Sequence, residues 1–210
     1  MDRLLILSVL FSLMLIVIRI CVTGELTFIF LPWNLFLAAI PYFISTKLEK
    51  KFPLKGYPLS QSLFFVVWIL FIPNSFYILT DLFHLEFRRG SSLWFDLTLI
   101  LSFAWNGLLL GVLSVSQMEK MVQRHLNRNV QILFIFPVMW LIAFGIYIGR
   151  FMRFNSWDIL TNPFELFENI GYMLLHPFRN IYVWAMILCF AVFMTLIYLS
   201  VKKISKTLQP

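Results

Sequence analysis

The sequence predicts an all-α integral membrane protein: a six-helix transmembrane bundle with an additional short interfacial or re-entrant helix on the outer face. Hydrophobic residues make up 60% of the 210 residues and charged residues only 13%, whereas a soluble domain is roughly half apolar and a quarter charged. The apolar residues form long blocks that match a hydrocarbon core about 30 Å thick. The basic residues lie in short segments between these blocks, so the net charge of +7 indicates membrane orientation and not nucleic-acid binding.

The predicted spans belong to a single transmembrane domain that covers residues 1–210. Each block is long enough to cross the core as a helix, which rises about 1.5 Å per residue. The longest stretch between spans, 151–180, is too short for a soluble domain. We predict spans at about residues 4–23, 26–46, 61–80, 93–117, 131–150 and 181–201.

The first span begins after Arg3 with an apolar run that is similar to a secretory signal peptide. Residues 19–24 read Arg-Ile-Cys-Val-Thr-Gly and contain no small-x-small cleavage site. We therefore expect a span that is retained. Cys21 and Cys189 both lie in apolar stretches, so no disulfide framework is expected.

A proline close to an asparagine marks the second and third spans. Proline has no backbone N–H and clashes with the carbonyl one turn earlier, so it kinks a helix. Asn74 follows Pro73 directly, and Asn34 follows Pro32 by two residues. A kink beside polar side chains is one way in which a helix opens a small polar cavity in a membrane.

Glycines recur at intervals of four in the fourth and fifth spans. Gly107-x-x-x-Gly111 and Gly145-x-x-x-Gly149 present faces on which another helix can pack closely. Gly149 shares its face with Arg153. We therefore expect close packing to bring this arginine near the other spans.

A shorter helix is predicted at about residues 163–175. Asn162 supplies an N-cap, Pro163 suits the first turn, and Glu165 complements the positive end of the helix dipole. Apolar residues then recur at helical spacing until His176-Pro177 ends the run. A helix of about 13 residues is too short to cross a membrane, so we expect it to lie in the outer interface or to re-enter the membrane.

The basic residues orient the bundle. Eleven of the 17 Lys and Arg residues lie in the N-terminal segment, the second and fourth loops and the C-terminal tail. Five lie on the opposite side, and Arg19 lies inside the first span. Because Lys and Arg concentrate in cytoplasmic loops, the sequence predicts that both termini are cytoplasmic.

With this orientation, most polar residues within the spans fall at the outer end. Ionisable groups inside a membrane are costly and need a partner or a purpose. Four polar residues follow one another along the third span at intervals of 3, 4 and 3, which places them on one helical stripe: Asn74, Tyr77, Asp81 and His84. We predict an outward-facing polar pocket built from the third, fourth and fifth spans and roofed by the 163–175 helix. Its binding residues are Asn74, Tyr77, Asp81, His84, Asp96, Arg150, Arg153 and Asp158, with Arg19 and Asn34 in support.

Four interpretations of this polar set stay open. In the first, the arginines pair with Asp81, Asp96 and Asp158 only to hold the bundle together. In the second, Arg150 and Arg153 clamp a phosphate or an anionic head group, because a guanidinium makes bidentate contacts with phosphate.

The third interpretation is an enzyme active site that uses Asp81 and His84 as acid and base, or as divalent-metal ligands with Asp96 and Glu86. No second carboxylate–His pair accompanies them, so no metal site is expected, and no cofactor motif occurs in the sequence. The fourth is a transport path, which usually shows internal repeats. The chain has no such repeat.

Three stretches carry a resemblance to a known family: residues 73–85 (PNSFYILTDLFHL), 94–96 (WFD) and 145–158 (GIYIGRFMRFNSWD). They resemble a bacterial family of multi-pass membrane proteins known only as a domain of unknown function. The match would extend from Pro32-Trp33-Asn34 to the last span. The resemblance implies a bacterial cytoplasmic membrane and a single domain, and it implies no activity, substrate or cofactor.

The sequence favours recognition of an anionic lipid or envelope-precursor head group at the outer face, with membrane lipids as partners. A membrane-embedded enzyme that uses Asp81 and His84 is an alternative. A structural or accessory subunit for a membrane protein partner, or a homo-oligomer, is another. Nucleic acid is not an expected partner.

Overall fold

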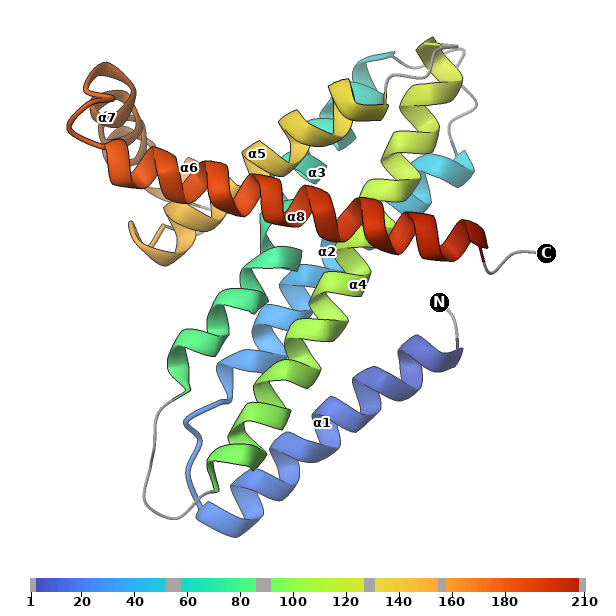
Figure 1. The fold of residues 1–210 in the computed structure, drawn as a ribbon, viewed down its shortest axis with the longest axis vertical. Coiled ribbons are helices and arrows are strands. Elements are labelled where there is room, and N and C mark those ends of the chain that lie inside the picture. Colours follow the sequence, from blue (N-terminus) through green and yellow to red (C-terminus); the bar gives the residue numbers. More distant parts are fainter. Residues whose placement is uncertain (1–2, 52–57, 86–91, 127–130, 155–157, 208–210) are drawn as a thin grey trace. The chain divides into compact units, whose positions relative to one another are not determined.

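A computed structural model describes residues 3–51, 58–85, 92–126, 131–154 and 158–207. Within these ranges every regular element is a helix, as the sequence predicts (Figure 1). The chain forms two compact units, Met1–Met118 and Glu119–Pro210. We call them the N-terminal and the C-terminal unit and describe each by itself.

Five helices in the described part of the chain are long and apolar enough to cross a membrane. They coincide with the first, third, fourth, fifth and sixth predicted spans. The third candidate span combines an α-helix with the 3₁₀-helix that continues it. The elements are α1 (Arg3–Thr23), α3 (Pro58–Tyr77) with η1 (Ile78–His84), α4 (Leu93–Leu126), α5 (Gln131–Arg150) and α8 (Ile181–Thr207).

Helix α2 (Phe30–Lys51) occupies most of the predicted second span but is not among the five. Its two prolines, Asn34 and the polar residues near its end lower its hydropathy, so a sixth span stays a prediction. The predicted start at residue 26 is wrong, because residues 27–29 form a turn. Pro32 lies in the first turn of α2, where its missing N–H leaves no hydrogen bond unmade. The expected kink at Pro32 is therefore wrong, and the proline inside this helix is Pro41.

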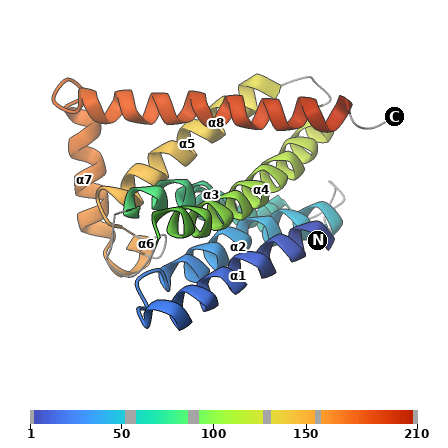
Figure 2. The ribbon, with the colours of Figure 1, turned by 60° about the horizontal axis from the view of Figure 1, so that its bottom comes forward.

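The N-terminal unit packs α1, α2, α3 and the first part of α4 around one apolar core. Helix α2 lies beside α3, as both ribbon views show (Figures 1 and 2). Each connection reverses the chain direction, so one end of the unit gathers the end of α1, the start of α2, the end of η1 and the start of α4. We call this the Arg19 end. The fully buried side chains of the core include Phe28, Leu31, Ile78, Leu99 and Phe103.

The glycines of α4 allow α3 to approach closely. A Cβ atom at Gly107 would lie 2.9 Å from the carbonyl oxygen of Ser75. A Cβ atom at Gly111 would lie 2.7 Å from the ring of Phe76. At contacts this short the neighbouring atoms of α3 and η1 would have to shift to admit a side chain, so the predicted close-packing face of the fourth span is confirmed. The corresponding face of α5 stays a prediction.

Helix α3 changes to a 3₁₀-helix where the sequence predicts a continued α-helical stripe. Residues Ile78–His84 form η1, and the hydroxyl of Thr80 donates to the carbonyl oxygen of Tyr77 at 2.6 Å. Short polar side chains such as Thr and Asp compete for backbone groups and weaken α-helix. The 3₁₀-helix has about three residues per turn, so the predicted stripe from Asn74 to His84 is wrong in its α-helical geometry.

In the C-terminal unit α5 packs against α8. Two shorter helices, α6 (Asp158–Thr161) and α7 (Pro163–Leu175), lie between them in the chain. Ala143, Ile187 and Ala191 form the apolar contact between α5 and α8. Beside it, Trp184 stacks on Trp140 with their ring planes only 8° apart.

Helix α7 has the bounds predicted for the short helix. Asn162 is its N-cap and Pro163 occupies the first turn. The Asn162 side chain makes no capping hydrogen bond and instead donates to the carboxylate of Glu165. The predicted side-chain cap is therefore wrong. The location of α7 in a membrane interface stays a prediction.

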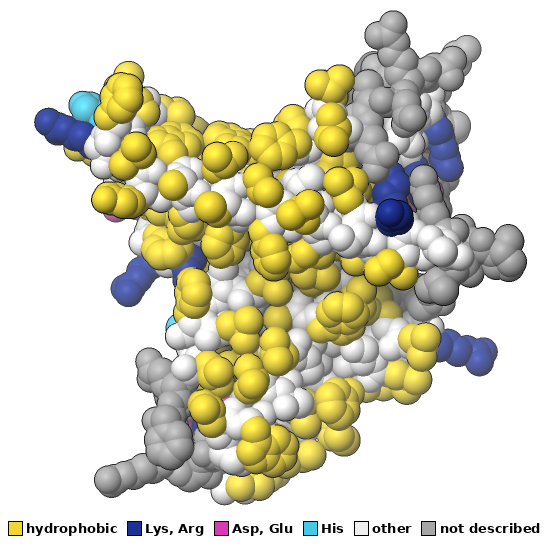
Figure 3. Space-filling model, in the orientation of Figure 1, with side chains coloured by type: hydrophobic (Ala, Val, Ile, Leu, Met, Phe, Trp, Pro, Cys, Tyr) yellow, Lys and Arg dark blue, Asp and Glu magenta, His cyan; other side chains and the backbone are white. Residues whose placement is uncertain are grey.

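Large apolar side chains cover the exposed faces of the helices (Figure 3). Leu4 is 79% exposed, Leu133 75% and Phe178 89%. Apolar surface on this scale is not compatible with water but suits lipid. The exposed surface and the five apolar helices together identify a helical membrane protein.

Candidate functional site

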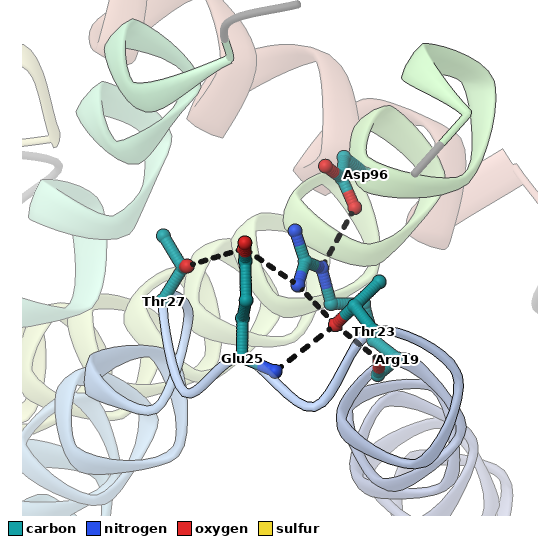
Figure 4. A network of polar contacts seen from close by, with 5 residues as sticks. All are labelled: Arg19, Thr23, Glu25, Thr27 and Asp96. Carbon is teal, nitrogen blue, oxygen red and sulfur yellow. Dashed lines mark hydrogen bonds and ion pairs between the residues drawn. The ribbon is translucent and has the colours of Figure 1, made fainter. Parts of the chain in front are cut away.

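Arg19 lies at the centre of a polar network at the Arg19 end (Figure 4). Its Nε donates to Oδ1 of Asp96, in the first turn of α4, at 3.2 Å. Both side chains are almost completely buried, at 2% and 1% exposure. The Phe28 ring lies 5.2 Å from the guanidinium carbon, which adds a cation–π contact. A buried arginine is tolerated only with such compensation.

The other edge of the same guanidinium meets residues of the α1–α2 connection. Nη1 donates to Oγ1 of Thr23 at 2.6 Å and to Oε2 of Glu25 at 3.5 Å. The hydroxyl of Thr27 donates to the same Oε2 at 3.2 Å. Glu25 is 50% exposed. Arg19 therefore has a buried edge paired with Asp96 and a second edge paired with a half-exposed carboxylate.

A second polar contact at the Arg19 end joins α2 to η1. Asn34 donates from Nδ2 to Oδ2 of Asp81 at 2.9 Å. Asp81 is fully buried and Asn34 is half-buried. The structure thus brings together two pairs of predicted site residues in one unit: Arg19 with Asp96, and Asn34 with Asp81.

The remaining predicted residues of the third span lie near this contact. His84 is exposed, and its ring meets the Phe30 ring edge-on with centroids 5.1 Å apart. Asn74 is half-buried and donates to the carbonyl oxygen of Phe71 at 3.0 Å, beside Pro73. Tyr77 is also half-buried.

In the C-terminal unit, the end of α5 carries the predicted arginine pair. Arg150 is the last residue of the helix and is half-buried, while Arg153 is exposed. The Phe154 N–H bonds to the Ile148 carbonyl oxygen at 3.2 Å, which closes the turn around Arg153. Arg153 has a φ of 61°, a left-handed conformation that costs a non-glycine residue roughly 1 kcal/mol.

Asp158 begins α6 and is half-buried. It accepts a hydrogen bond from the Thr161 hydroxyl at 2.9 Å. The predicted single pocket joins residues of both units, so it stays a prediction. Among the described residues, no group of three His, Cys, Asp or Glu side chains could hold a metal ion. Glu86, named above as a possible ligand, lies outside the described residues.

The sequence analysis missed a cluster of polar side chains around one buried glutamate in the C-terminal unit. Glu119, near the end of α4, is 1% exposed and accepts hydrogen bonds from Tyr198 at 2.5 Å and from Lys202 at 2.6 Å. Gln123 donates to it as well, at 2.9 Å. Glu119 is surrounded by basic residues in the sequence, and a count of Lys and Arg in each loop does not single it out. The spacing of four between Tyr198 and Lys202 on α8 was the available signal.

A second missed cluster lies at the end of the N-terminal unit opposite the Arg19 end. The Ser114 hydroxyl accepts from the Trp68 indole N–H at 2.8 Å and donates to the Pro41 carbonyl oxygen at 2.9 Å. Ser45 lies 3.0 Å from Ser114 and donates to Gln117 at 2.6 Å. These contacts link α2, α3 and α4. Serine is common in membrane helices, so nothing in the sequence singled these residues out.

Asn106 forms a third polar contact, between α4 and α1. Its amide donates to the Ser12 hydroxyl at 2.9 Å and to the Ser8 carbonyl oxygen at 3.2 Å. Its own oxygen has no partner among the described residues. Asn106, Ser114 and Asp96 place buried polar groups at three depths along α4.

A family model described as "Protein of unknown function (DUF1361)" matches residues 33–198. The matched segment runs from the first turns of α2 to Tyr198 in α8, and it confirms the family resemblance seen in the sequence. Comparison with curated proteins and with solved structures found no match.

Proposed function

We propose that this chain, which belongs to the DUF1361 family of proteins of unknown function, binds an anionic lipid or envelope-precursor head group at its outer face. In this proposal it resides in a bacterial cytoplasmic membrane with both termini cytoplasmic. Helix α2 is the sixth span, and α7 lies in the outer interface. The basic residues of the predicted cytoplasmic segments support this orientation.

The single observation that carries the proposal is the conformation of Arg153. This exposed arginine stands just beyond α5 at a φ of 61° and makes no polar contact with a described residue. Strained backbone of this kind clusters at binding sites, where the surrounding structure holds it in place. A guanidinium presented in this way suits a phosphate group.

Arg150 supports the same reading less strongly. A basic residue in the last turn of a helix is also stabilised by the negative end of the helix dipole, which accounts for Arg150. The dipole effect falls off within the last turn, so it does not account for Arg153. Arg19 differs from both, because Asp96 already occupies one edge of its guanidinium.

Lipid binding to the protein in nanodiscs tests the proposal. Arg153→Gln should weaken binding of fluorescent phosphatidylglycerol at least about tenfold, because a charge-assisted hydrogen bond contributes roughly 1.5–3 kcal/mol. Arg179→Gln removes an exposed arginine of the same unit and should leave affinity unchanged. Equal affinities for Arg153→Gln and the unmodified protein would contradict a head-group site at the end of α5.

A structural or accessory role is the second candidate, and the burial of the Arg19–Asp96 pair favours it. A pair at 2% and 1% exposure can be replaced by apolar residues of similar size with little loss of stability. The double variant Arg19→Met with Asp96→Leu should then fold normally while each single variant is destabilised. A double variant as unstable as the single ones would count against a purely structural pair.

A further inference from the structure

We propose that the edge of Arg19 that faces Glu25 is a second anion site, which Glu25 closes in this structure and which takes a monoanionic phosphodiester. The site lies in the N-terminal unit and uses neither Arg150 nor Arg153. It therefore goes beyond the head-group site at the end of α5 and can fail or succeed independently of it.

The two edges of the guanidinium differ in how firmly they are held (Figure 4). The Nε edge and Asp96 are both buried, so this ion pair is a fixed part of the fold. On the other edge, Nη1 reaches Glu25 at 3.5 Å, the limit of a hydrogen bond. Glu25 is half-exposed, whereas Arg19 is 2% exposed, so water and other anions reach the carboxylate end of this contact and compete with it. Another anion can therefore replace Glu25 at little cost.

Glu25 shows which chemistry this edge accepts. Arg19 Nη1 and the Thr27 hydroxyl both donate to the same carboxylate oxygen, Oε2. A phosphate oxygen in that position would receive the same two hydrogen bonds.

The charges at this edge select a monoanion. Arg19 carries one positive charge, while Asp96 and Glu25 carry one negative charge each. Exchange of the Glu25 carboxylate for a phosphodiester keeps the local charge unchanged. A phosphomonoester dianion would add a second negative charge near Asp96, which stays buried beside Arg19, and like charges in a poorly solvated site repel strongly.

The chain around Glu25 permits this exchange. Glu25 lies in the short connection between α1 and the turn at residues 27–29. Gly24 has a φ of +69°, and a Cβ atom there would meet nothing within 4 Å. Glu25 can therefore swing outward while the helices stay in place. Arg19 lies four residues before the end of α1, or about 6 Å along the axis, so its second edge is within reach of a head group.

The main test is Glu25→Gln in nanodiscs of phosphatidylcholine that contain phosphatidylglycerol, a phosphodiester monoanion. Loss of the tethered carboxylate should raise affinity for phosphatidylglycerol about threefold to tenfold. It should raise affinity for phosphatidic acid, a phosphomonoester, less. Glu168→Gln removes an exposed glutamate of α7 and should change neither value. Unchanged or lower affinity for phosphatidylglycerol in Glu25→Gln would overturn the proposal.

Thr27→Val in the Glu25→Gln background provides an isosteric second variant. It removes one donor to the anion and should return affinity to the level of the unmodified protein. If Thr27→Val changes nothing, the donor set is wrong. Competition by soluble glycerophosphoglycerol, which has the phosphodiester without acyl chains, identifies a free anion as the ligand, and binding that resists it identifies the lipid. Loss of binding in Arg153→Gln alone would support only the site at α5.

Discussion

At the residue scale, each buried carboxylate described here has a donor from another helix or helical segment. Arg19 of α1 donates a hydrogen bond to Asp96, and Asn34 of α2 donates one to Asp81. Tyr198 and Lys202 of α8 both donate to Glu119. A charge inside a membrane protein that loses its partner stays buried and uncompensated, which costs several kcal/mol. These contacts therefore act as fixed points between helices, whichever ligand the protein binds.

Lys202→Met tests this role at Glu119. The variant keeps the length of the side chain but leaves the Glu119 carboxylate, which is 1% exposed, without its cation. We expect the free energy of unfolding, measured by titration with sodium dodecyl sulfate, to fall by about 3 kcal/mol. Lys203→Met alters an exposed neighbour and should change it by less than about 0.5 kcal/mol. Equal stabilities for the two variants would show that Glu119 does not depend on Lys202.

Ser114→Ala tests the neutral cluster. The Trp68 indole N–H donates to Ser114, and Trp68 is fully buried. Without the hydroxyl this donor has no acceptor, which costs about 1–3 kcal/mol. Ser200→Ala, at an exposed position of α8, is the control. The same titration should show a loss of stability for Ser114→Ala alone, and a neutral effect would mean that another acceptor replaces the hydroxyl.

At the element scale, the sequence predicts where helices lie better than how they end. Long apolar runs between polar segments place the starts of α1, α4, α5 and α8 to within a residue or so, but α4 and α8 continue beyond the predicted ends at residues 117 and 201, because a helix need not stop where the membrane core ends. The end of α3 differs. Thr80 supplies a local reason for the change to a 3₁₀-helix at residues 78–84, because its hydroxyl bonds to the Tyr77 carbonyl oxygen. The close packing of Ile78 against Gly107 exists only in the folded unit and has no local sequence signal.

Gly107→Ala measures the close approach between α3 and α4. Alanine favours a helix over glycine by about 1 kcal/mol, but its Cβ atom would lie 2.9 Å from the backbone oxygen of Ser75. Backbone cannot move aside easily, so we expect a net loss of about 1–3 kcal/mol. Gly171→Ala in α7 meets nothing within 4 Å and should stabilise by roughly 0.5–1 kcal/mol. If thermal unfolding shows that Gly107→Ala lowers the melting temperature while Gly171→Ala raises it, the contact is confirmed. Changes of the same sign in both variants would contradict it.

At the scale of the whole molecule, the candidate site was only partly predictable. The sequence singles out Asp81, Asp96, Arg19 and Asn34 as polar residues near one end of the spans, and the N-terminal unit brings them together in pairs. The sequence could not assign partners, because pairing depends on which helix faces lie side by side. Glu119 was not singled out either, since one acid among basic residues gives no periodic signal.

Membrane topology is the remaining prediction at this scale, and it decides between five and six spans. Five apolar helices satisfy the length and hydropathy of a span; α2 must also cross if Leu26 and Ser92 share the outer side and Lys47 faces the cytoplasm. All three side chains are exposed. Cysteines at these positions, in a chain with Cys21 and Cys189 replaced by serine, report their side through a membrane-impermeant maleimide. We expect labelling of Leu26→Cys and Ser92→Cys in intact cells.

Lys47→Cys should label only after permeabilisation, because Lys47 lies in one of the basic segments that the positive-inside bias assigns to the cytoplasm. Labelling of Lys47→Cys and Leu26→Cys from one side would show that α2 does not cross. The hydrogen bond of 2.9 Å between Asn34 and Asp81 holds the start of α2 at the depth of η1 whether or not α2 crosses. The side from which Lys47→Cys is labelled therefore decides whether α2 is a sixth span.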